Sequence, residues 1–203
     1  MAGRRIKAEN RHDRSVIVLG CSFFLGCLLG IFFVTELDTR TAKELSEFLA
    51  DYFELTKGGA ISRSVPRILW NHGRWVILCT VAGFSATGIV FLPVLTCFRG
   101  FLLSFSISCF AYLFGRAGMV PAIVLFGLSA MLWLPSIYIL AAAAMECSAG
   151  RIAARQEKVR PIAVPVRKFR KALLLSVLIL VVCVCVECWI VPLLLPFAAG
   201  IIR

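Results

Sequence analysis

The run from Ala172 to Phe197 constrains this chain more than any other stretch. It is apolar on all sides and carries a single acidic residue, Glu187. About 20 apolar residues in a helix cross the ~30 Å hydrocarbon core of a bilayer, whereas a helix on the surface of a soluble protein keeps a polar face. We therefore expect this segment to span a membrane.

The composition extends this expectation to the whole chain. Of its 203 residues, 60% are hydrophobic and only 16% are charged, and the charges are gathered in short blocks between long apolar runs. This pattern predicts an all-α, polytopic membrane protein that forms a single membrane domain over residues 1–203. Basic residues beside membrane segments set orientation and contact anionic headgroups of the lipid bilayer, so the positive net charge does not indicate nucleic-acid binding.

We expect about five transmembrane helices. Their approximate ranges are 15–35, 75–96, 101–114, 119–145 and 172–197. The first is interpreted as an uncleaved signal anchor, because it is too long for a signal peptide and no cleavage site closes it. The third would be roughly 21 Å long as a helix, which is short for a span, and the alternative is a re-entrant hairpin.

Breaks in the apolar pattern predict where these helices end. Arg99-Gly100 is expected to form a structural turn before the third span, and Arg116-Ala-Gly118 the break after it. Pro135 is expected to kink the fourth span, because proline removes a helical hydrogen bond. Within the first span, Gly26-x-x-x-Gly30 is a weak indication of a close helix contact.

The distribution of basic residues predicts the orientation. With five spans and a cytoplasmic N-terminus, the basic loop 146–171 and Arg99 lie in the cytoplasm, while the loop 36–74 and the C-terminus are extracytoplasmic. This arrangement follows the positive-inside rule. A re-entrant third segment would place residues 146–171 outside and break the rule, so we favour five full spans.

The outer loop is expected to contain a short amphipathic helix. Thr41-Ala-Lys-Glu44 has the spacing of a capping box, which marks a helix start. Apolar side chains then recur with helical spacing, and this face is the predicted contact with the membrane surface or with a protein partner. Its members are Leu45, Phe48, Leu49 and Tyr52.

The sequence offers no catalytic, metal-binding or cofactor-binding pattern, so we expect neither an enzyme nor a cofactor. There are nine cysteines and two histidines. The cysteines lie in or beside apolar runs, and Cys185-x-x-Cys188 is interpreted as small packing residues of a helix. His72 lies beside the second span.

Glu187 is the residue with the most open interpretation. A carboxylate inside a span is costly and usually faces protein or a polar cavity. We favour a structural or assembly contact, with interfacial exposure and ion coupling as the alternatives. Because Arg99 and Arg116 are expected at helix ends, no intramembrane base is expected near Glu187, which argues against a proton relay.

The order of segments resembles the stage II sporulation protein M family of spore-forming bacteria. The resemblance is carried by the run Phe24–Gly30, by Asn71-x-x-Arg74, by Phe98-Arg99-Gly100-Phe101 and by the closing Glu187-Cys188-Trp189-Ile190-Val191-Pro192. The chain departs from the family at Ser104, where a second glycine is usual, and at Gly127-Leu128-Ser129, where a Pro-polar pair is common.

The resemblance implies a non-catalytic membrane scaffold of the engulfment machinery at the sporulation septum. Its implied partners are the cell-wall hydrolases known as stage II sporulation proteins D and P. We expect the apolar face of the loop helix, with Glu187 and Trp189, to contribute to partner binding, and homo-oligomerisation is left open. The competing hypothesis is a small ion- or proton-coupled transporter or channel that uses Glu187.

Overall fold

The described part of the chain consists of helices joined by short turns. The computed structural model describes residues 2–38, 65–123, 127–156 and 163–190, together with positions 40, 43, 44 and 47. The long helices are α1 (Ala2–Thr35), α3 (Val65–Phe84), α4 (Gly88–Ala122), α5 (Leu128–Gln156) and α6 (Ala163–Cys185). A short π-helix, η2 (Val186–Ile190), continues α6. The expected all-α fold is therefore confirmed.

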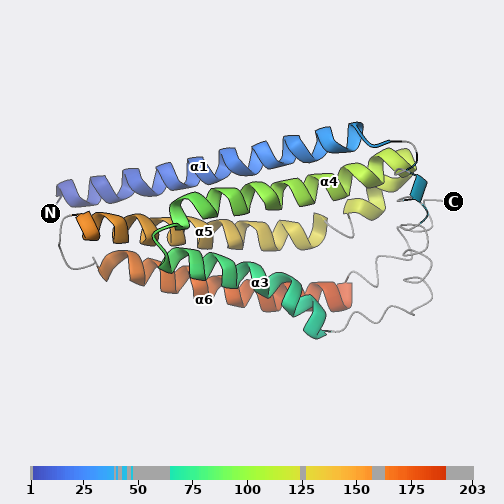
Figure 1. Cartoon of the computed structure of the whole chain (residues 1–203). Coiled ribbons are helices and arrows are strands. Elements are labelled where there is room, and N and C mark those ends of the chain that lie inside the picture. The colour runs from blue at the N-terminus through green and yellow to red at the C-terminus, as the bar shows by residue number, and fades with distance from the viewer. Residues whose placement is uncertain are drawn as a thin grey trace.

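The five long helices form an elongated bundle in which each one runs antiparallel to the next along the chain (Figure 1). The start of α1, the α3–α4 turn and the facing ends of α5 and α6 gather at one end of the bundle. The end of α1, the start of α3 and η2 lie at the other. The N-terminal basic block thus lies at the same end as the basic residues around the α5–α6 connection, as five antiparallel helices require.

Four of these helices are long and apolar enough to cross a membrane. The qualifying segments are Asp13–Thr35, Gly88–Leu113, Ala130–Ile152 and Val166–Trp189. The fifth helix, α3, is 20 residues long and carries polar groups in its first half. The chain is thus a polytopic helical membrane protein.

Helix α5 occupies the centre of the bundle and contacts α1, α3, α4 and α6. Its membrane segment is 67% buried, whereas the other three candidate spans are mostly exposed on their outer faces. The alanine run from Ala141 to Ala144 explains this position, because small side chains let neighbouring helices approach closely. A Cβ atom on Gly83 of α3, for example, would lie 2.9 Å from the Cβ of Ala144.

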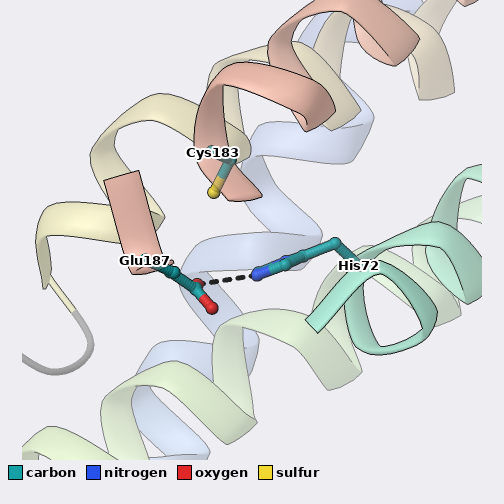
Figure 2. A group of neighbouring side chains, drawn as sticks. All are labelled: His72, Cys183 and Glu187. Atoms are coloured by element: carbon teal, nitrogen blue, oxygen red, sulfur yellow. Dashed lines mark hydrogen bonds and ion pairs between the residues drawn. The ribbon is translucent and has the colours of Figure 1, made fainter. Parts of the chain in front are cut away.

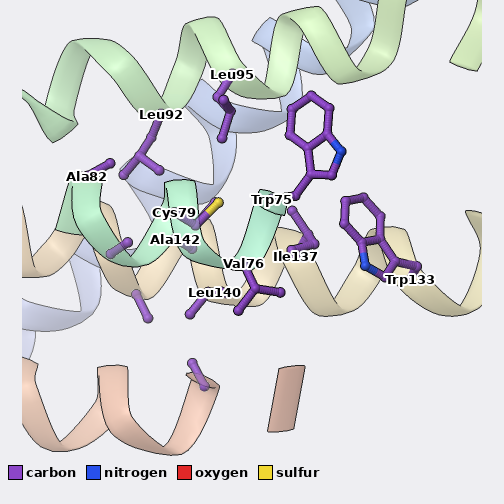
Figure 3. Packing of buried hydrophobic residues seen from close by; sticks show 14 of the residues in the cluster. Trp75, Val76, Cys79, Ala82, Leu92, Leu95, Trp133, Ile137, Leu140 and Ala142 are labelled. Atoms are coloured by element: carbon purple, nitrogen blue, oxygen red, sulfur yellow. The ribbon is translucent and has the colours of Figure 1, made fainter. Parts of the chain in front are cut away.

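The core between α3, α4 and α5 is apolar over most of its length (Figure 3). Cys79 of α3, Leu92 of α4 and Leu140 of α5 are fully buried there. Toward the end of the bundle where α3 begins, the core changes to aromatic side chains, with the rings of Trp75 and Trp133 packed edge to face at 6.4 Å. The exposed apolar side chains of the bundle face outward, as a lipid environment requires.

The turn between the second and third long helices lies earlier than the sequence predicted. The expected span 75–96 is divided at residues 85–87, where Ser85 Oγ lies 2.7 Å from Thr87 Oγ1 and accepts the Thr87 N–H at 3.2 Å. The Thr87 carbonyl then accepts the first amides of α4. Ser148 of α5 fixes the turn by donating its hydroxyl to the Ser85 carbonyl at 2.7 Å.

The prediction of a structural turn at Arg99-Gly100 is therefore wrong, because both residues lie inside α4. Gly100 is needed there for packing, since a Cβ atom would overlap the carbonyl oxygen of Phe23 on α1. The break after the third expected span is close to its predicted place. It occurs at Gly115, whose φ of 58° lies in the left-handed region that favours glycine.

Two further predictions concern the fourth span and the outer loop. Pro135 lies inside α5, as expected. In the loop, Arg40 and Glu44 are helical and exposed, and Arg40 Nε lies 3.2 Å from Glu44 Oε1. The apolar positions of the predicted loop helix, Leu45, Phe48, Leu49 and Tyr52, lie outside the described residues.

Glycines line the contact between α1 and α4. Added Cβ atoms on Gly26 and Gly30 would overlap the backbone of α4 at Cys97 and the side chain of Ser104, respectively. The Gly26-x-x-x-Gly30 pattern therefore marks a close contact within the chain. Ser104 donates its hydroxyl to the Cys27 carbonyl at 2.8 Å, so this serine adds a hydrogen bond across the contact.

Candidate functional site: a polar cluster between α3 and the end of α6

The candidate site is built on a contact between α3 and the segment that follows α6. His72 Nε2 lies 2.7 Å from Glu187 Oε1 (Figure 2). The His72 side chain is 5% exposed and that of Glu187 is 14% exposed, so this contact is largely shielded from solvent and lipid. A carboxylate and an imidazole that meet in such surroundings form a stronger contact than the same pair in water.

A third ionisable group, Arg99 of α4, approaches the same cluster. Its guanidinium carbon lies 4.5 Å from the centre of the Trp133 ring and 5.3 Å from that of Trp75. Burial and the like charge of Arg74 disfavour the Arg99 cation, whereas Glu187 and Cys183 attract it. The two aromatic faces and the carboxylate therefore offset part of the cost of placing the guanidinium in the bundle.

The local fold explains why these groups meet. Cys183 and Glu187 are four residues apart, so a helix places both on the face that meets α3. The α-helix ends at Cys185 and widens into η2, and such π-turns frequently mark functional sites. On the other side, His72 lies in the first half of α3, about 10 Å from its start.

Several buried polar atoms of the cluster have no hydrogen-bond partner among the described residues. These are His72 Nδ1, Arg99 Nε and the indole nitrogens of Trp75 and Trp133. A buried polar atom without a partner is destabilising and calls for an explanation, such as a bound ion or water. The cluster thus has unused capacity to bind a small polar ligand.

The sequence predicted one member of this cluster and missed the others. The structure places Glu187 in a contact between helices, whereas interfacial exposure would leave its side chain open. The expectation that Arg99 lies at a helix end is wrong, and with it the argument that no base lies near Glu187. The expected span 75–96 leaves His72 outside the helix because it places the α3–α4 turn too late. The Ser85-Ala86-Thr87-Gly88 pattern is the sequence signal for the true turn, and a helix that ends there includes His72.

Trp189 lies just beyond the cluster. Its side chain is 80% exposed, and Trp70 at the start of α3 is 68% exposed. Tryptophan side chains of this kind are enriched where a membrane protein meets the lipid–water interface. Both residues belong to the end of the bundle from which the loop between α1 and α3 leaves and returns.

Comparison with known protein families identifies the family to which the chain belongs. The model of the SpoIIM family, stage II sporulation protein M, matches residues 19–192. The chain belongs to this family. The matched region holds His72, Arg99, Cys183 and Glu187, so the whole cluster lies within the SpoIIM region of the chain.

The SpoIIM resemblance recognised in the sequence is thereby confirmed. No curated protein and no solved structure matches the chain. Two of the motifs that carried the resemblance flank the cluster. Asn71 and Arg74, one turn apart on α3, are joined by a 2.9 Å hydrogen bond from Arg74 to the Asn71 side-chain oxygen, and Glu187 opens the closing motif.

Proposed function

We propose that this protein is a non-catalytic membrane scaffold that recruits peptidoglycan-degrading partners to the septal membrane during engulfment in sporulation. The observation that carries the proposal is the SpoIIM match over residues 19–192. The partners that the resemblance implies are the stage II sporulation proteins D and P.

The shape of the protein supports this role. The described residues form a bundle whose centre is filled by α5, and the polar cluster is enclosed by helices instead of opening as a substrate cleft. A scaffold needs a fixed outer surface. The outer end of the bundle supplies exposed tryptophans beside a loop in which Arg40, Lys43, Glu44 and Glu47 are helical and exposed.

The orientation follows from the same proposal. The N-terminus and the basic α5–α6 connection lie in the cytoplasm, and the outer loop and C-terminus lie outside the membrane, where the cell wall is. The bundle supports this because it gathers the two basic regions at one end. The positive-inside rule then assigns that end to the cytoplasm.

The test is co-purification of the hydrolase partners from sporulating cells. Replacing Leu45, Phe48 and Leu49 together with serine removes the apolar face of the predicted loop helix, and we expect co-purification to fall at least tenfold. Membrane insertion and yield should stay unchanged, because these residues lie outside the segments that the sequence predicts to span the membrane.

The same helix supplies a matched control. Its polar side includes three residues that the structure shows as exposed, namely Arg40, Lys43 and Glu47. Replacing these three with serine should leave co-purification as in the unmodified protein. If the apolar variant retains its partners, or if the polar variant loses them equally, the apolar face is not the docking surface.

A further inference from the structure

Three metal-ligating side chains converge in the polar cluster. His72 Nε2, the sulfur of Cys183 and a carboxylate oxygen of Glu187 all lie within 4.8 Å of one another. Figure 2 shows the three side chains directed into the same space between α3 and the end of α6. We propose that they bind a divalent transition-metal ion of the Zn²⁺ class, which goes beyond the scaffold function and does not depend on it.

The ligand set defines the class of metal. A thiolate, an imidazole and a carboxylate are the donors that Zn²⁺ takes in proteins, at bond lengths of about 2.0–2.3 Å. Mg²⁺ and Ca²⁺ prefer oxygen donors throughout, so Cys183 and His72 disfavour them. Three protein donors leave a fourth tetrahedral position for water or another donor, as in open zinc sites.

The spacing fits a shared ion with little rearrangement. Donor atoms that sit on one tetrahedral zinc are roughly 3–4 Å apart at those bond lengths. The His72–Glu187 separation is 2.7 Å, and the third donor lies within 4.8 Å of both. A small opening of the first pair and a rotation of the Cys183 side chain bring all three into range.

Burial favours a preorganised site. Cys183 is fully buried and His72 is 4% exposed. Their backbones belong to helices packed in the bundle, so the donors are held by rigid elements, which is what a precise metal site requires. Glu187, at the wider π-turn, is the partly exposed ligand and gives the ion a route from the outer end.

The site would hold the ion beside another cation. Arg99 interacts electrostatically with Cys183 and Glu187, and the two anionic donors of the bound state offset the repulsion between Arg99 and the metal. On binding, the Cys183 thiol gives its proton to solvent and the thiolate forms the metal–sulfur bond. The proton that lies between His72 Nε2 and Glu187 in the metal-free contact must also leave. It exchanges through solvent and is carried on Nδ1, and the freed Nε2 lone pair forms the metal–nitrogen bond.

A His72–Glu187 hydrogen bond without metal is the competing explanation. That contact needs no thiol, whereas the metal site requires Cys183. The role of Cys183 therefore separates the two explanations. Cys185 provides the matched control, because it is an exposed cysteine two residues further along the same helix.

The experiment uses the full chain, purified in detergent under reducing conditions and titrated with Co²⁺ as a spectroscopic substitute for Zn²⁺. We expect a thiolate-to-cobalt charge-transfer band and the visible bands of a tetrahedral site, at one ion per chain. Zn²⁺ should displace the cobalt. Cys183→Ser should abolish the charge-transfer band, and Cys185→Ser should keep it.

A second readout covers variants that fold poorly. Excess Zn²⁺ should raise the thermal unfolding midpoint of the unmodified protein and of Cys185→Ser, but not that of Cys183→Ser or His72→Gln. The proposal is overturned if cobalt gives no charge-transfer band, or if the band survives in Cys183→Ser. It is also overturned if Zn²⁺ stabilises all four proteins equally.

Discussion

The α1–α4 contact and the α3–α6 contact join helices of the same bundle in opposite ways. Between α1 and α4, Gly26, Gly30 and Gly100 let the two backbones touch, and the polar contribution includes the Ser104–Cys27 hydrogen bond. At the outer end of α3 and α6, the contact consists of an imidazole and a carboxylate, with an arginine beside them.

The difference shows what each contact can contribute. Apolar side chains gain nothing by leaving lipid for protein, so helices in a membrane associate through close packing and through polar contacts. The glycine contact depends on shape and tolerates no added atoms. The polar contact depends on charge balance, so its stability can change when ions bind. The packed glycine surface offers no such binding groups.

The largest expected effect comes from removing the carboxylate of the polar contact. Glu187→Ala leaves His72 without its partner and Arg99 without its nearby anion, and breaking a buried ionic contact costs about 3–5 kcal/mol. Unfolding in detergent with increasing dodecyl sulfate, followed by fluorescence of the buried Trp75 and Trp133, should show this loss.

Two variants sharpen this prediction. Glu187→Gln keeps an oxygen that can accept from His72, so it should lose less stability than Glu187→Ala. Removing the charges of both Arg99 and Glu187 with leucine should cost less than Glu187→Ala alone, because no unpaired charge remains. A Glu187→Ala loss below about 1 kcal/mol would show that charge balance does not hold the α3–α6 contact.

The next largest loss of stability is expected from a substitution that disturbs the close packing at the glycine contact. Gly26→Ala places a Cβ atom on the Cys97 carbonyl, so α1 and α4 must separate, at a cost of about 1–3 kcal/mol. The matched control is Gly73→Ala on α3, where no atom lies within 4 Å of the added Cβ. That variant should be neutral or slightly stabilising, because alanine favours a helix over glycine. Equal effects of the two substitutions in the same unfolding assay would remove the distinction.

The smallest effect concerns the hydrogen bond within the glycine contact. Ser104→Ala removes the hydroxyl that donates to the Cys27 carbonyl, and such bonds between membrane helices contribute about 0.6 kcal/mol. Ser106→Ala is the control, since Ser106 donates to Leu102 of its own helix. A Ser104→Ala loss as large as that of Gly26→Ala would mean that the α1–α4 contact also depends on polar groups.

The sequence predicted the helical membrane fold because long apolar runs permit few other structures. It predicted the helix ends less well. The expected turn at Arg99-Gly100 relied on one charged residue beside a glycine, whereas a partly buried arginine is tolerated inside a helix where aromatic rings and an anion lie beside it. The real turn at Ser85–Thr87 is made by short hydroxyl side chains that interrupt hydropathy only weakly.

The candidate site could be predicted only in part for a related reason. Glu187 is conspicuous in an apolar run, so it was recognised at once. His72 and Cys183 are separated from each other by more than 100 residues, and their meeting depends on the packing of α3 against α6. The sequence pattern around each residue does not indicate which helices pack against each other.

The position of Glu187 late in the chain has a consequence for biogenesis. Membrane helices emerge from the ribosome in order, so His72 and Arg99 enter the bilayer before their acidic partner has been synthesised. Until α6 has been made, Arg99 therefore has the aromatic rings of Trp75 and Trp133 beside it but not the carboxylate of Glu187. The contact between α3 and α6 is thus formed after the helices that hold the two cationic or ionisable partners are already in place.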